Sequence, residues 1–299
     1  MKALLATDGS CFAATAMRTA LRVLYPEDRN LDVLCVVPSY NLKDETAGRE
    51  RYEQRTLTET TRILEEARAL IAPDAKAVNL FTEVGSPAVV IADKTESYDL
   101  TVVGARGAGF RSEAGLGPVA SRVMEHAAGP VLIGRALQSD EGLRILVAVD
   151  GSAASLRAVE TLGSLCDLSA ADVCLMYVAE TPWLNLAREG DWSTASEEEK
   201  ETSETGVFEK EFVGEGEALI EDARKLLRQE RPLVTSRIEE GNPANEILAE
   251  AERGQYDLVV LGATGNRDMK HRMLGSVSSR IAWEVPCSVL IVREPGETG

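Results

Sequence analysis

The chain has 299 residues, with 49 acidic and 32 basic side chains, so its formal net charge is −17. This charge argues against a nucleic-acid-binding protein, which would need a basic surface, and against electrostatic attachment to anionic lipids. The length suffices for one or two domains with a full core.

The cysteines are scattered and lie mostly in apolar runs, which indicates reduced, buried thiols rather than a disulfide framework or a metal site. No apolar run approaches the length of a membrane span, and the first residues do not show a signal-peptide pattern. We therefore expect a cytoplasmic protein without membrane attachment. The cysteines are Cys11, Cys35, Cys166, Cys174 and Cys287.

Short apolar runs alternate with longer helical patterns, which predicts an α/β fold with a parallel sheet. In the first half, helix 12–24 has apolar residues at helical spacing, so one of its faces should pack on the sheet. The strands expected there lie near residues 2–7, 31–37, 77–84, 99–104 and 130–134. The helices expected there lie near residues 12–24, 50–71, 86–97 and 118–127.

The second half repeats the first in the same order, which indicates a tandem duplication. Asp8-Gly9-Ser10 returns as Asp150-Gly151-Ser152, and Pro130 and Pro286 each precede the last strand of a copy. Such a proline suits an edge strand or the start of a strand. We predict domains over residues 1–138 and 143–299. The strands of the second copy are expected near residues 143–149, 172–178, 233–239, 257–262 and 287–292.

The second copy carries an insertion over residues 185–217, with 11 acidic and 3 basic residues. We interpret it as a solvated loop that runs into a helix, with residues 197–201 as an exposed first turn. A partner-binding lid containing Trp192, with Trp183 just before it, is the alternative.

Two glycine clusters lie between the apolar run 257–261 and the helix expected over 277–283. They are Gly262-Ala263-Thr264-Gly265 and, nine residues later, Gly275-Ser276-Val277-Ser278. Glycine permits close approach of the backbone to a ligand, and the N–H groups at a helix N-terminus bind anions. The pattern therefore predicts a cradle for phosphates.

This spacing resembles the nucleotide-binding motif of the universal stress protein family, and the resemblance covers nearly the whole chain. It implies two tandem Rossmann-like domains of the adenine nucleotide α-hydrolase type. Each would contain a five-stranded parallel sheet of order 3-2-1-4-5. Asp150 and Gly262 should then converge at the point where the strand order reverses. The expected ligand is ATP, with Mg²⁺ or Mn²⁺ held through the phosphates rather than by a protein ligand cluster.

By the same resemblance, Asp150 and a backbone group near Val178 would hold adenine. Gly262 and Gly265 would lie under the ribose and phosphates, and the second cluster would wrap the phosphates. The predicted cofactor-binding residues are Asp150, Gly151, Val178, Gly262, Thr264, Gly265, Arg267, Gly275, Ser276, Val277 and Ser278. No catalytic residue is assigned.

The first copy departs from this pattern. Its glycine motif is Gly104-Ala105-Arg106-Gly107, but Pro118 and Ala120 stand where the second copy has Ser276 and Ser278. A charge-assisted hydrogen bond contributes about 1.5–3 kcal/mol. Losing two would weaken phosphate binding roughly 10² to 10⁴-fold. We predict that the first copy binds nucleotide poorly or not at all.

Several of these residues have plainer interpretations. Asp8 and Asp150 could simply cap the helices that follow them. The run Lys270-His271-Arg272 could neutralise phosphates or be an ordinary charged loop, and His271 could be a general base. His126 is interpreted as structural. The sequence Gly115-x-Gly117-x-x-Ala120 does not directly follow a strand, so it is not a dinucleotide fingerprint.

The favoured function is a nucleotide-binding regulatory or protective protein of the stress response. The resemblance implies that the two copies pack as a pseudo-dimer through strands 131–134 and 289–292, and apolar edge strands make a homodimer plausible. One alternative is an enzyme with slow ATP hydrolysis or self-phosphorylation at Ser276 or Ser278. The other is an interaction protein that binds no nucleotide.

Overall fold

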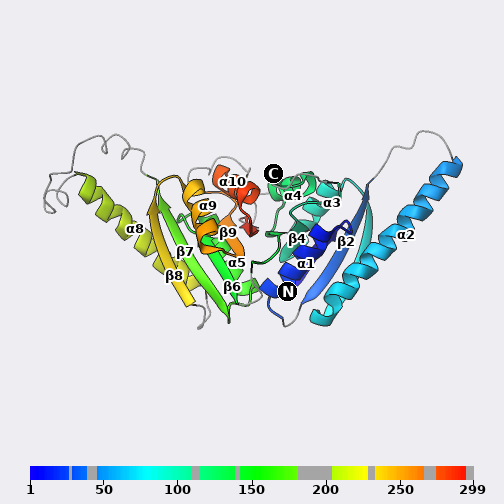
Figure 1. The fold of residues 1–299 in the computed structure, drawn as a ribbon, viewed down its shortest axis with the longest axis horizontal. Helices are drawn as coiled ribbons and strands as arrows, with labels where there is room; N and C mark the ends of the chain where they lie inside the picture. The colour runs from blue at the N-terminus through cyan, green and yellow to red at the C-terminus, as the bar shows by residue number, and fades with distance from the viewer. Residues whose placement is uncertain are drawn as a thin grey trace.

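The structure is a computed structural model in which the strands of both halves form one ten-stranded sheet (Figure 1). It describes residues 1–26, 29–38, 46–109, 115–138, 142–180, 204–227, 233–265 and 274–293. Within two of these ranges, 46–54 and 204–212, only the backbone is described.

The elements of the first copy follow the predicted alternation. They are β1 (Lys2–Thr7), α1 (Cys11–Val23), β2 (Asn30–Pro38), α2 (Thr46–Ile71), β3 (Ala77–Gly85), α3 (Pro87–Lys94), β4 (Leu100–Gly104), α4 (Pro118–His126) and β5 (Val131–Gly134). Short 3₁₀ turns follow α2 and α3.

The second copy repeats this order. Its elements are β6 (Leu143–Ala148), α5 (Ala153–Leu165), β7 (Ala171–Ala179), α8 (Glu204–Leu226), β8 (Leu233–Glu240), α9 (Pro243–Gly254), β9 (Leu258–Gly262), α10 (Ser276–Glu284) and β10 (Ser288–Val292). Of the acidic insertion, the described part belongs to α8. Trp183, Trp192 and the expected first turn over 197–201 lie outside the described residues.

The strand order along the sheet is β3-β2-β1-β4-β5-β10-β9-β6-β7-β8. Each copy therefore has the predicted order 3-2-1-4-5, and its own strands are parallel. The two five-stranded sheets are continuous because β5 pairs antiparallel with β10, with Leu132 opposite Leu290. The last strand of each copy is therefore internal. Pro130 and Pro286 mark strand starts, and the alternative of a free edge strand is wrong.

The sheet lies between two layers of helices. One continuous core cluster joins side chains of α1, α2, α5 and α8 to one face, and a second cluster joins α3, α4, α9 and α10 to the other. Successive residues of β1 alternate between the clusters, since Ala3 and Leu5 belong to the first and Leu4 and Ala6 to the second. This alternation is the pattern of a strand buried on both faces.

The α1 and α5 helices also meet at their C-terminal ends. Leu24 and Cys166 form an antiparallel bridge, and Tyr25 N–H donates to the Leu165 carbonyl oxygen at 3.0 Å. The two copies thus contact each other through the sheet and through one helix layer. Among the described residues, no helix combines the length and the apolar character that crossing a bilayer requires.

Candidate functional site

The loops that follow β6 and β9 meet at the carboxyl end of the sheet. These strands are neighbours, with Val147 opposite Val260. A Cβ atom placed on Gly265 would lie only 2.7 Å from Asp150 Oδ2, so the carboxylate lies directly against this glycine. The structure therefore brings together the two sequence motifs that were expected to converge.

Asp150 stabilises the turn after β6 rather than capping a helix. Its Oδ1 accepts hydrogen bonds from the Ser152 N–H at 3.0 Å and from Ser152 Oγ at 2.6 Å. The N-cap of α5 is Ser152, whose Oγ accepts from Ser155 N–H at 3.1 Å. Ser10 is the N-cap of α1 in the same way. The alternative that Asp8 and Asp150 are the helix caps is therefore wrong.

Gly262 has a packing role. A Cβ atom at this position would lie 2.7 Å from the backbone of Ala154 and Ser155, so the absent side chain allows α5 to approach β9. Gly151 adopts a positive φ of 76°, which favours glycine. These two glycines shape the loop, while Gly265 leaves space beside the Asp150 carboxylate.

The N-terminus of α10 lies next to the loop that follows β9. Gly275 is its N-cap, without a capping side chain, and its N–H donates to the Ala263 carbonyl oxygen at 2.7 Å. Ser278 is buried and its Oγ donates to the Gly262 carbonyl oxygen at 2.7 Å. Ser276 is exposed and Val277 is half-buried. The first N–H groups of a helix lack intrahelical acceptors, so this end of α10 is suited to hold an anion.

The remaining predicted residues divide into two groups. Val178 lies at the end of β7 opposite Glu239, and the Thr264 carbonyl oxygen accepts from Ser152 Oγ at 3.3 Å. Arg267 lies outside the described residues, as do Lys270, His271 and Arg272. Among the residues that are described, no cluster of three or more His, Cys, Asp or Glu side chains could hold a metal ion.

The first copy has the same turn with a partly different set of donors. Asp8 Oδ1 accepts from Ser10 N–H at 3.0 Å and Oδ2 from Ala108 N–H at 2.9 Å, while Gly107 takes the place of Gly265. Pro118 is the first residue of α4 and Ala120 is buried. The geometry of the turn is retained, and both serine hydroxyls are absent.

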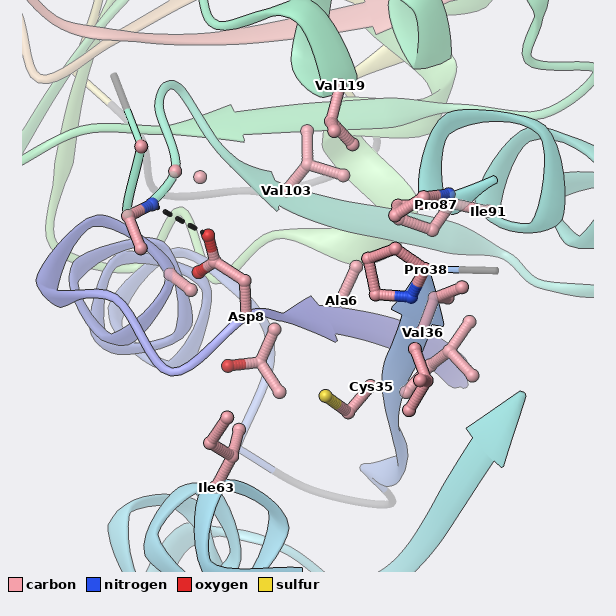
Figure 2. Close-up of a pocket in the computed structure, with 18 of the residues that line it drawn as sticks. Ala6, Asp8, Cys35, Val36, Pro38, Ile63, Pro87, Ile91, Val103 and Val119 are labelled. Carbon is pink, nitrogen blue, oxygen red and sulfur yellow. Dashed lines mark hydrogen bonds between the residues drawn. The ribbon is translucent and has the colours of Figure 1, made fainter. Parts of the chain in front are cut away.

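A cavity of about 800 Å³ opens at this point in the first copy. Figure 2 shows apolar side chains around it, with the Asp8 carboxylate at one side. The sequence predicted a weakened nucleotide site here but not this cavity. The repeat gave one indication that residues of this region line a site, since Val36 is the counterpart of Val178, a predicted site residue, and Val36 lines the cavity. Its other apolar lining residues include Leu34, Pro38, Ile63, Pro87, Ile91, Val103 and Val119.

Two side chains near these sites have raised pKa values. Burial raises the pKa of the Cys35 thiol, and the charge of Asp8 adds to this. Burial likewise raises the pKa of Tyr177, with smaller contributions from Glu215 and Asp150. Both side chains are therefore protonated at neutral pH, so Cys35 is not poised as a nucleophile.

Comparisons with known proteins agree with this architecture. Over 153 residues the chain is 31% identical to a universal stress protein of Methanocaldococcus jannaschii, which covers 51% of this chain and 82% of that protein. It is 27% identical over 240 residues to a universal stress protein of Mycolicibacterium smegmatis, which covers 77% of this chain and 75% of that one.

The crystal structure of a universal stress protein from Archaeoglobus fulgidus has the same fold over 98% of both chains, with a TM-score of 0.63 and 21% identity. The model of the universal stress protein family matches residues 1–135 and again residues 143–293. The chain therefore belongs to the universal stress protein family, as a member with two tandem copies.

Proposed function

We propose that this tandem universal stress protein binds ATP in its C-terminal domain and acts as a cytoplasmic regulatory or protective protein of the stress response. The observation that carries the proposal is the contact between Asp150 and Gly265 beneath the N-terminus of α10. A carboxylate that can accept hydrogen bonds and a helix end that attracts anions lie together at the point where the strand order reverses.

In this proposal, residues 1–138 and 143–299 are the two domains, and only the second has a competent site. Asp150 and the backbone near Val178 would hold adenine, and Gly265 would leave room for the ribose. Ser276 and the N–H groups of the first turn of α10 would hold the phosphates. Mg²⁺ or Mn²⁺ would enter with the phosphates and balance their charge.

We propose a different role for Ser278. Its hydroxyl proton is engaged by the Gly262 carbonyl oxygen, so we assign it to fixing α10 on β9 rather than to donating to phosphate. Val36 supports the assignment of Val178, because it is the equivalent residue of the first copy and lines the cavity there.

The two copies would act as one intramolecular pseudo-dimer. The antiparallel pairing of β5 with β10 and the bridge between Leu24 and Cys166 support this proposal. Both contacts place residues of one copy against their equivalents in the other.

Calorimetric titration of nucleotide-stripped protein with ATP tests the proposal, with Gly275→Ala/Ser276→Ala as the site variant. We expect one site per chain in the wild type and loss of that site in the variant. Absence of binding to the wild type would contradict the proposal. A steady turnover above about 1 s⁻¹ would instead favour an enzyme.

A further inference from the structure

We propose that the cavity of the first copy binds a neutral, mainly apolar small molecule rather than a nucleotide. The cavity measures about 800 Å³, which lies within the range of sites for small organic ligands. Apolar side chains from both faces of the sheet surround it, and Leu34, Ile91 and Val103 among them are buried (Figure 2).

Prolines replace residues that carry a backbone N–H at one phosphate position and two residues beyond Val36, the counterpart of Val178. Pro118 stands where Ser276 begins α10, and Pro38 stands at the end of β2 where Glu180 follows β7. Neither proline has a backbone N–H. A polyanion would leave its water shell here with fewer donors to replace it, whereas an apolar ligand has no hydrogen bonds to water that need replacing.

The side chains that meet between the sheet and the long helix also differ between the two copies. The register of the strands makes Cys35 the counterpart of Tyr177. The Tyr177 ring packs so closely on α8 that a Cβ on Gly216 would lie 2.6 Å from it. In the first copy the matching positions are Cys35 and Thr60, and both line the cavity.

The charges around the cavity are balanced. Asp8 and Glu59 are acidic, and Arg55 and Arg106 are basic. The Arg106 guanidinium lies 5.4 Å from the centre of the Phe12 ring, a cation–π distance. A site for a triphosphate is favoured by an excess of positive charge, which this lining lacks, and Pro118 removes one N–H from the start of α4, so a neutral ligand is favoured.

The test uses the neutral apolar dye Nile red as the probe and a matched pair of filling variants. Val119 lines the cavity, and its counterpart Val277 lies in the first turn of α10. We expect one saturable Nile red site per wild-type chain. Val119→Trp should weaken dye binding at least about tenfold and leave ATP binding unchanged, because it fills only the first cavity. Val277→Trp should do the reverse.

These variants separate this proposal from the proposed function, since each site has its own ligand and its own variant. Saturable dye binding that excess ATP leaves intact supports the proposal. Three results would overturn it: no saturable binding by the wild type, equal binding by Val119→Trp, or one-for-one displacement of the dye by ATP.

A second measurement needs no variant and so does not depend on how Val119→Trp folds. Cys35 lines the cavity and Cys11 is exposed, so both can be followed by mass spectrometry during prolonged reaction with excess N-ethylmaleimide at alkaline pH, which offsets the raised pKa of the buried Cys35 thiol. Saturating Nile red should slow alkylation of Cys35 at least about tenfold and leave Cys11 unaffected. Alkylation of Cys35 at the same measurable rate with and without the dye would refute occupancy of this cavity.

Discussion

Arg135 and Arg293 are equivalent residues of the two copies, and each donates hydrogen bonds to the last turn of a helix in the other copy. Arg135 Nη2 donates to the Ala282 carbonyl oxygen in α10, and Arg293 Nη2 donates to the Met124 carbonyl oxygen in α4, both at 2.8 Å. The α10 and α4 helices are those whose N-termini face the two candidate sites. Each site is therefore built on a helix whose far end is held by the other copy.

Replacing Arg293 with Met should destabilise the fold by about 2–4 kcal/mol, because one buried and one partly buried carbonyl oxygen at the end of α4 lose their charged donor. Urea unfolding at pH 7 measures the change. Arg62→Met is the control, since Arg62 makes only exposed ion pairs with Glu59 and Glu66, and it should change little. Equal unfolding midpoints for wild type and Arg293→Met would contradict this role.

Asp32 should make stability depend on acid pH. Its carboxylate is buried beside Asn79 and Tyr98, each donating at 2.8 Å. Burial alone would raise the pKa of Asp32, but these bonds and the Lys2 ammonium lower it below its ordinary value of 3.8. A group whose pKa is lowered by folding stabilises the protein above that ordinary value and loses this effect as the pH falls through the folded value.

We therefore expect Asp32→Asn to unfold more easily than the wild type at pH 7, by about 1–3 kcal/mol. The difference should shrink progressively below pH 3.8, the ordinary pKa of this group. Urea unfolding of both proteins at several pH values measures it. A difference that is the same at every pH would show that the charge of Asp32 does not contribute.

The two serines of α10 should respond differently to substitution. Ser276 is exposed at the helix start, so Ser276→Ala should weaken ATP binding by about tenfold and leave stability unchanged. Ser278 donates to Gly262, so Ser278→Ala should lower stability by about 1 kcal/mol. Its direct effect on ATP affinity should be smaller than that of Ser276→Ala. Calorimetry and urea unfolding on both variants check this, and the opposite ranking in ATP affinity would assign phosphate contact to Ser278.

Gly265→Ala should displace the Asp150 carboxylate, because the new methyl group would lie 2.7 Å from Oδ2. We expect ATP affinity to fall by about tenfold. Gly214→Ala is the matched control, since a Cβ there meets nothing within 4 Å. It should leave affinity unchanged. If Gly265→Ala binds ATP like the wild type, the contact between Asp150 and Gly265 does not form part of the site.

Periodicity and repeats predicted the order and type of the described elements. Strands buried on both faces form short continuous apolar runs, whereas the helices show apolar residues at helical spacing, so the two can be distinguished in the sequence. The convergence of Asp150 with the Gly262 motif was predicted from the strand order that the resemblance implies, and the structure adds that Gly265 of this motif lies against the carboxylate. Pro130 and Pro286 did not decide whether the strands that follow them lie at an edge of the sheet or inside it, since a proline before a strand is compatible with both. Only the register of Leu132 with Leu290 distinguishes them.

Side-chain roles were the harder part. Ser276 and Ser278 look alike in the sequence, and only the packing of α10 on β9 shows that one hydroxyl is exposed and the other is bonded to Gly262. The first-copy cavity was missed because Ile63 reaches it from α2, whose register on the sheet no local pattern reveals. Likewise, only the alignment of the strands shows that Cys35 and Tyr177 occupy equivalent positions in the two copies.

We propose one ATP site per chain, in the second domain, and none in the first. Titration calorimetry of the nucleotide-stripped chain with ATP, repeated on Asp150→Ala and on the matched Asp8→Ala, tests it most directly. We expect one site per wild-type chain, weakened at least about tenfold by Asp150→Ala and unchanged by Asp8→Ala. Two sites per chain, or a single site that Asp8→Ala abolishes, would contradict it.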